Sequence, residues 1–161
     1  CSHNTGACLM PKIDIQNLPV RTGSGYPDPY GQQFDDRAQV RLGDPAGLTQ
    51  FGVNLVRLEP GAMSSLRHWH EKQDEFLVVT EGTCTLVDDT GETALTPGEC
   101  AAFPAGDANG HHIVNRSDET TAFVVVGTRT ETEVGYYSDI DMMVTVDASG
   151  MNFTRKNGDP V

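Results

Sequence analysis

From residue 48 onward the chain is a series of short apolar runs separated by turn residues. Residues 48–58 carry β-branched and aromatic side chains and end at Pro60-Gly61, a pattern that predicts a strand followed by a turn. Such runs recur about every 8 to 12 residues, which is typical of an all-β sandwich or barrel. No segment has a sustained helical period. The later runs are 76–80, 83–87, 92–96, 100–103, 111–115 and 121–127.

Length and charge exclude several classes of protein. With 161 residues the chain has room for one domain but not for two of full size. Its 11 Lys and Arg residues against 23 Asp and Glu residues give a net charge of −12, which argues against nucleic acid as a partner. No apolar run approaches the roughly 20 residues needed to cross a bilayer. We therefore expect no membrane partner.

The cysteines indicate a compartment. Cys1, Cys8, Cys84 and Cys100 form no C-x-x-C pair, and the chain is too long to be a disulfide scaffold. We expect free thiols, buried and inert in the case of Cys84 and Cys100, and a reducing, cytoplasmic location. Residues 1–9 lack the features of a signal peptide, and we interpret them as a vector remnant or leader.

The barrel is predicted to span residues 48–129, between an N-terminal arm (10–47) and a C-terminal extension (130–161) that packs on it. Gly, Pro, Tyr and Asp crowd residues 19–36, which favours an irregular arm. The runs 76–79 and 123–126 do not alternate with polar residues, so both of their faces should be covered. A second subunit, giving a homodimer, is one possible cover, and the arm together with tail residues 140–161 is the other.

Four of the five histidines lie in two short segments, His68-Trp69-His70 and His111-His112. His68 and His70 project from one face of a strand, because side chains alternate there. Glu75 opens the next apolar run and can turn toward the same interior, and His111 can add a third imidazole from a later strand. Three imidazoles and one carboxylate suit one divalent ion such as Mn, Fe, Co, Ni, Cu or Zn. An H-x-H pair alone is also compatible with ordinary core or surface histidines.

The glycines that frame these residues give the chain a resemblance to the cupin superfamily. The first cupin motif is G-x5-H-x-H-x(3,4)-E-x6-G. It falls here on Gly61, His68, His70, Glu75 and Gly82, with six residues rather than five between Gly61 and His68.

The second cupin motif, G-x5-P-x-G-x2-H-x3-N, falls on Gly98, Pro104, Gly106, His111 and Asn115. Four residues rather than two separate Gly106 from His111. This insertion leaves open whether the third imidazole comes from His111 or from its neighbour. We choose His111, because it keeps the three-residue gap to Asn115 and shares a strand face with it.

The resemblance implies a jelly-roll barrel, the double-stranded β-helix of cupins. From Met10 the chain is also similar to a group of small bacterial single-domain cupins that share H-x-H-E-x-x-D-E-F and F-P-A-G-x-A-N-G-H-H. Some of these are labelled sugar phosphate isomerases.

Neighbouring residues have less specific interpretations. Asp74 could replace Glu75 as a ligand, but the six-residue gap to Gly82 favours Glu75. Gln50 and Asn54 share one strand face and could line a pocket or bond to each other. Trp69 points away from the two histidines, which indicates packing, and Arg67 on that outward face should form an ion pair with Glu71 or another carboxylate.

Two classes of function fit these features. One is a metal-dependent enzyme acting on a small polar metabolite, by isomerase, dioxygenase or decarboxylase chemistry. The other is a non-enzymatic domain that binds or senses a small molecule, since fold alone does not settle function. Four intact ligands and the lack of a helix-turn-helix output module favour the enzyme. Against it, no general base is apparent beyond the ligands, because we expect His112 to point out of the barrel.

Overall fold

The structure, a computed structural model, describes residues 12–161; the expected leader (1–9), with Cys1 and Cys8, lies outside the described residues. These residues form strands and three short 3-10 helices (η), and 46% of them are strand and 7% helical. The elements are η1 (Ile15–Asn17), β1 (Val20–Thr22), η2 (Tyr30–Gln33), β2 (Arg37–Arg41), η3 (Asp44–Ala46), β3 (Phe51–Leu58), β4 (His68–His70), β5 (Glu75–Glu81), β6 (Cys84–Asp88), β7 (Gly91–Leu95), β8 (Cys100–Phe103), β9 (His112–Val114), β10 (Thr121–Thr128), β11 (Glu133–Tyr137), β12 (Met143–Asp147) and β13 (Gly150–Thr154).

The all-β prediction is confirmed, and each apolar run predicted between residues 48 and 127 contains a strand. Turn glycines explain why the boundaries follow the sequence. Gly82 and Gly98, for example, have φ values of 67° and 91°, which residues with a Cβ rarely adopt. No helix within residues 12–161 is long and apolar enough to span a membrane.

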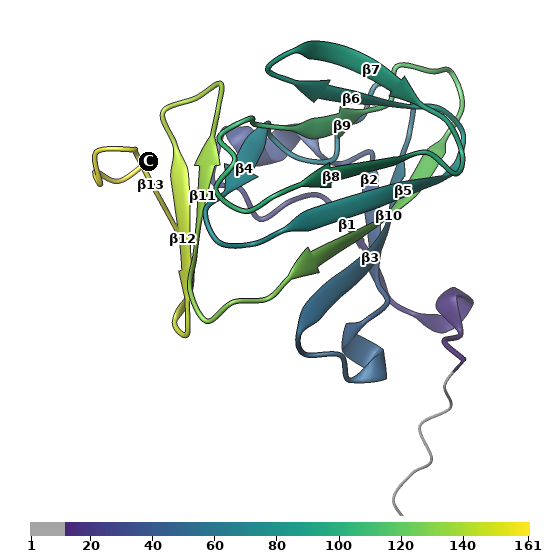
Figure 1. The fold of residues 1–161 in the computed structure, drawn as a ribbon, viewed down its shortest axis with the longest axis horizontal. Coiled ribbons are helices and arrows are strands. Elements are labelled where there is room, and N and C mark those ends of the chain that lie inside the picture. Colours follow the sequence, from purple (N-terminus) through teal and green to yellow (C-terminus); the bar gives the residue numbers. More distant parts are fainter. Residues whose placement is uncertain (1–11) are drawn as a thin grey trace, which may run out of the picture.

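The strands make three antiparallel sheets (Figure 1). A six-stranded sheet, in the order β1-β2-β3-β10-β5-β8, faces a three-stranded sheet, β7-β6-β9. The four-stranded sheet β13-β12-β11-β4 stands at one end of this pair. The main core fills the space between the first two sheets. Its buried residues are Val56, Leu58, Ala62, Leu77, Val79, Cys84, Leu95, Ile113 and Phe123.

The buried Asn115, from the second motif, holds the end of this core together. Its amide Nδ2 donates to the carbonyls of Leu58 (2.9 Å) and Glu119 (2.8 Å). Its Oδ1 accepts from the backbone amide and the hydroxyl of Ser117. All the hydrogen-bonding capacity of a buried amide is thereby used, which such a site requires.

The terminal segments are more ordered than the sequence indicated. Within the arm, predicted to be irregular, β1 and β2 extend the six-stranded sheet past β3. In the C-terminal extension, β11 pairs with the histidine strand β4, and β12 and β13 follow it outward. A second buried cluster around Tyr137, Met142 and Val144 also includes Tyr26 from the arm. Part of the arm and the C-terminal extension therefore pack together beside β4.

The two thiols differ in exposure. Cys84 is buried and Cys100 is exposed, and neither forms a disulfide. The expectation of a buried Cys100 was wrong, because residues 101 and 103 face the core and residues 100 and 102 face outward.

The outer face of the six-stranded sheet is apolar and only partly covered by the described chain. Paired rows such as Leu55, Val124 and Val78 run across it, and Phe76 is 42% exposed. Residues 140–161 do not cover this face, because β12 and β13 belong to the four-stranded sheet at the end of the pair. This leaves the second subunit as the simpler cover.

We predict a homodimer through this face. Sedimentation at micromolar concentration should show a dimer, and Phe76→Lys should shift it toward monomer, because a charge would be buried at the interface. Met151→Lys is the matched control, since Met151 is an exposed apolar residue (61%) on β13. A wild-type monomer, or equal effects of the two variants, would contradict the prediction.

Candidate metal centre

Two imidazoles come from the short strand β4. His68 and His70 pair with Tyr137 and Gly135 of β11, and their rings lie on the same side of the strand. Their Nε2 atoms are 3.2 Å apart. Nδ1 of His68 lies 2.8 Å from the Leu66 carbonyl, to which it can donate a hydrogen bond. That tautomer leaves the Nε2 lone pair of His68 free for a ligand.

Glu75 and His111 complete the cluster from two other strands. Glu75 is the first residue of β5, and its Oε2 lies 3.7 Å from Nε2 of His70. His111 precedes β9 and is joined to His68 by a β-bridge with reciprocal backbone hydrogen bonds. Its Nε2 lies 3.3 Å from Oε1 of Glu75. The structure thus groups His68, His70 and Glu75, and places His111, the fourth predicted ligand, against Glu75.

The distances between donor atoms fit one bound transition ion. Ligands about 2.1 Å from an ion lie about 3.0 Å apart at right angles and about 3.4 Å apart in a tetrahedron. The separations of 3.2, 3.3 and 3.7 Å are close to these values. Ligand atoms of His68, His70 and Glu75 all lie within 4.8 Å of one another, whereas His111 is within reach of Glu75 but outside this limit for at least one of the others. Facing acceptor nitrogens also need a proton or a cation between them.

The neighbouring histidines of the second motif point in different directions. His111 is 3% exposed and directed at Glu75. Nδ1 of His112 lies 2.9 Å from the Ser65 carbonyl. His112 is paired with Val87 of β6, which points to the side of the strand opposite to Leu86, and Leu86 packs on the core. Of the two neighbours, His111 is therefore the one directed at the cluster.

Burial and hydrogen bonds set the protonation of His68 and Glu75. Burial, followed by the neighbouring His70, lowers the pKa of His68 to about 4. Burial alone would raise the pKa of Glu75, but hydrogen bonds from His111 and His70 outweigh it and hold this pKa well below its usual range. At neutral pH His68 is a neutral donor and Glu75 a carboxylate, the forms that bind metal.

The metal-free protein should therefore lose stability in mild acid. Between the unfolded pKa of about 6.5 and the folded pKa of about 4, unfolding lets His68 take up a proton. In this range the free energy of unfolding decreases as the pH is lowered, by up to about 1.4 kcal/mol per pH unit. Urea unfolding of chelator-treated protein at pH 7 and pH 5 measures this fall, which His68→Asn should reduce. Equal stability at both pH values would refute the expectation.

The loop between His70 and Glu75 is held by a carboxylate that sequence reasoning missed. Glu133, 4% exposed at the start of β11, accepts hydrogen bonds from the amides of Glu71 (2.8 Å) and Lys72 (3.2 Å). Asp74, the alternative ligand, instead accepts from the Ala105 amide at 2.8 Å. The loop is thereby fixed on both sides.

Two tyrosines also lie beside the cluster. The rings of Tyr137 and His68 have centroids 6.0 Å apart, and Tyr26 packs edge-on against Tyr137 at 5.5 Å. Burial raises the pKa of both phenols, so they keep their protons at neutral pH. Neither residue belongs to the two motifs, and the sequence offered no signal for them.

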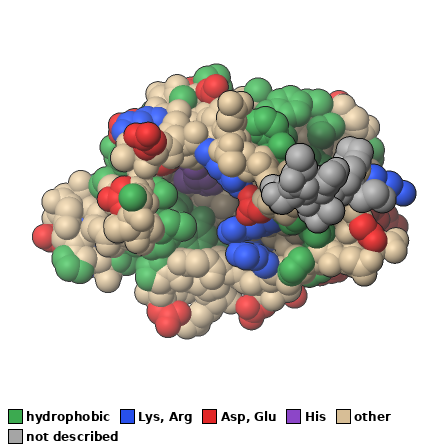
Figure 2. Space-filling model, turned by 90° about the horizontal axis from the view of Figure 1, so that it is seen from below, with side chains coloured by type: hydrophobic (Ala, Val, Ile, Leu, Met, Phe, Trp, Pro, Cys, Tyr) green, Lys and Arg blue, Asp and Glu red, His purple; other side chains and the backbone are tan. Residues whose placement is uncertain are grey.

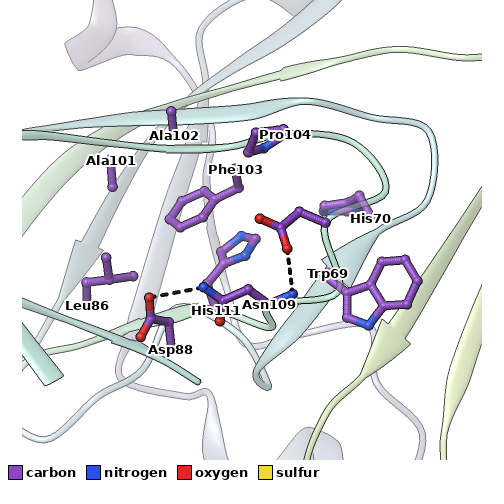
Figure 3. A pocket seen from close by; sticks show the side chains of 11 residues that line it. Trp69, His70, Leu86, Asp88, Ala101, Ala102, Phe103, Pro104, Asn109 and His111 are labelled. Atoms are coloured by element: carbon purple, nitrogen blue, oxygen red, sulfur yellow. Dashed lines mark hydrogen bonds between the residues drawn. The ribbon is translucent and has the colours of Figure 1, made fainter. Parts of the chain in front are cut away.

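A cavity of about 260 Å³ lies next to His70 and His111 (Figure 3). Phe103 stacks on His111 with ring centroids 3.5 Å apart. Asp88 accepts a hydrogen bond from Asn109 at the rim, and Asp107 also lines the space. The cavity holds acidic and apolar side chains but no Lys or Arg.

Trp69 on β4 and Arg67 just before it make packing and ion-pair contacts. Trp69 stacks on Tyr136 with centroids 4.5 Å apart and contributes to the cavity wall. Arg67 forms ion pairs with Asp89 and Asp139. The expected ion pair of Arg67 is therefore present, with these partners in place of Glu71.

Comparison with known proteins identifies the family. The family profile described as a cupin domain matches residues 54–127. A crystal structure of a sugar phosphate isomerase of the cupin superfamily from Silicibacter pomeroyi is 62% identical, with a TM-score of 0.93 over 94% of this chain and 96% of that one. The chain belongs to the cupin family.

Other solved structures are less similar. A protein provisionally named a sugar phosphate isomerase, from Acidithiobacillus ferrooxidans, is 28% identical with a TM-score of 0.69, over 77% of this chain and 80% of the other. The polyketide cyclase RemF from Streptomyces resistomycificus shares the fold, at 23% identity and a TM-score of 0.59 over 74% and 79% of the two chains. No functionally curated protein matches this cupin.

Proposed function

We propose that this cupin is a metal-dependent isomerase of a sugar or sugar phosphate, with one divalent transition ion held by His68, His70, Glu75 and His111. The observation that carries the proposal is the group of His68, His70 and Glu75, whose ligand atoms lie within 4.8 Å of one another, with His111 3.3 Å from Glu75. The 62% identical relative, itself described as a sugar phosphate isomerase, supports the choice of reaction. The free thiols Cys84 and Cys100 are consistent with our proposal of a cytoplasmic location.

When bound, such an ion supplies Lewis acidity that polarises the oxygens of a hydroxy-carbonyl compound. The protein's own side chains would orient that substrate. Tyr26 and Tyr137 keep their protons and can donate hydrogen bonds to substrate oxygens. The ring of Phe103, which stacks on His111, excludes water from that side of the imidazole.

Deuterium exchange tests the proposal, because enolisation exchanges the proton next to the carbonyl. Protein loaded separately with Zn, Mn, Fe, Co or Ni is incubated in D2O with aldoses, ketoses and their phosphates, and followed by NMR. We expect deuterium at the carbon next to the carbonyl, and the isomer, with one or more ions. His112→Ala should behave as wild type and His70→Ala should be inactive. Sugar binding without exchange under every ion would favour the non-enzymatic alternative.

A further inference from the structure

Arginines gather on the inner side of the two arm strands. In antiparallel pairs, residues directly opposite each other point to the same side of a sheet. Arg37 lies opposite Leu58 and Gln39 opposite Val56, and both partners are core residues. Arg21 lies opposite Gln39 in the next pair. The arm thus brings positive charge to the side of the sheet that carries Glu75.

The half-buried guanidinium of Arg37 has no carboxylate partner. Among residues 12–161, the ion pairs of arginine within 4.0 Å involve Arg41, Arg57, Arg67, Arg116 and Arg129. Arg37 donates instead to neutral oxygens, the Gly23 carbonyl at 3.3 Å and Oε1 of Gln39 at 3.1 Å. Its Nε is buried without any partner. A buried charge held by neutral groups remains available to an anion.

This charge lies near the metal cluster. Arg37 donates to the carbonyl of Gly23, three residues before Tyr26, and the ring of Tyr26 packs on Tyr137, whose centroid lies 6.0 Å from that of His68. Figure 2 shows a hollow in which a His side chain lies recessed, with Lys or Arg side chains beside it. The cavity beside His70 differs, because Asp88 and Asp107 line it and would repel an anion.

We propose that Arg37, with Gln39 beside it, binds the phosphate group of the substrate on this side of the metal cluster. The inference rests on the proposed function and assigns the phosphorylated rather than the free sugar as its substrate. The planar guanidinium can give two parallel hydrogen bonds to phosphate oxygens, a strong, charge-assisted arrangement. Gln39 can add a donor from its amide nitrogen.

The test measures binding of inorganic phosphate to metal-free protein at low salt, by calorimetry and phosphorus NMR. Wild-type protein should bind saturably at millimolar concentrations, and Arg37→Gln should weaken binding by at least about tenfold. Arg57→Gln is the matched control and should change nothing, because Arg57 is exposed and paired with Glu81. Arg37→Lys keeps the charge without the fork and should bind at an intermediate level; it decides the matter if Arg37→Gln does not fold.

Unchanged phosphate binding in the Arg37 variants, or none in the wild type, overturns the subsite. A second arm compares glucose 6-phosphate with glucose, and a preference for the phosphate ester that Arg37→Gln removes supports it. These results are independent of turnover. Phosphate binding through Arg37 without deuterium exchange would keep the subsite and reject the isomerase, whereas exchange with no role for Arg37 would do the reverse.

Discussion

Replacing His70 by alanine should lower metal affinity on the order of a hundredfold or more while the barrel stays folded. One of four converging donors is lost, and its position on the short strand β4 leaves no substitute imidazole at that distance. Loss of a residue that merely supports a ligand already costs about 10 to 100-fold, so loss of a ligand should cost more. Competition with a chromophoric chelator, on protein purified without a histidine tag, measures the affinity.

His112→Ala is the matched control and should bind metal as wild type does, because its ring is hydrogen-bonded to the Ser65 carbonyl. Circular dichroism should show an unchanged strand spectrum for both variants. If His112→Ala loses the metal and His111→Ala keeps it, the proposed ligand set is wrong at that position. If wild-type protein binds no ion at neutral pH, the proposed metal site itself is rejected.

The second large effect is expected at Gly82, in the turn between β5 and β6. Its φ of 67° disfavours any Cβ, and an added Cβ would lie 2.9 Å from the Thr120 carbonyl oxygen and 3.2 Å from Cα of Thr121. Backbone cannot move aside as a flexible side chain can. A left-handed residue costs about 1 to 2 kcal/mol and overpacking about 1 to 3 more, so Gly82→Ala should lose about 3 kcal/mol.

Gly98→Ala separates the two causes. Gly98 also has a positive φ, 91°, but nothing lies within 4 Å of its would-be Cβ. It should cost about 1 kcal/mol, from conformation alone. Urea unfolding of the metal-free proteins measures both values. Equal losses would mean that contact with β10 contributes nothing at Gly82.

The positions of the barrel strands could be predicted because they depend on local sequence. Turn residues such as Pro97-Gly98 separate the barrel strands, so each run could be placed without knowing its partner. The residues of the proposed metal site were selected in the same way. His68 and His70 share a face by alternation, and the motif spacing selected Glu75 and His111, which the structure places together.

Other parts of the site depend on long-range packing and could not be predicted. Tyr26 lies in the segment rich in Gly and Pro, and its contact with Tyr137, which in turn lies beside His68, joins segments more than a hundred residues apart. Glu133 lies some sixty residues from the amides it binds. Nothing in local periodicity records such partners, since each depends on which strands become neighbours.

Through the hydrogen bonds from Glu71 and Lys72 to Glu133, the C-terminal sheet would be thermodynamically coupled to an ion bound at the proposed site. Residues 71–74 connect the proposed ligands His70 and Glu75. Ordering these two side chains therefore also orders the backbone amides that donate hydrogen bonds to Glu133. Linkage is reciprocal: an ion that binds more tightly when β11 is docked must also hold β11 in place more firmly. Cleavage of residues 133–154 by proteases should therefore decrease as metal occupancy increases, so that the protease resistance of the C-terminal strands reports whether metal is bound.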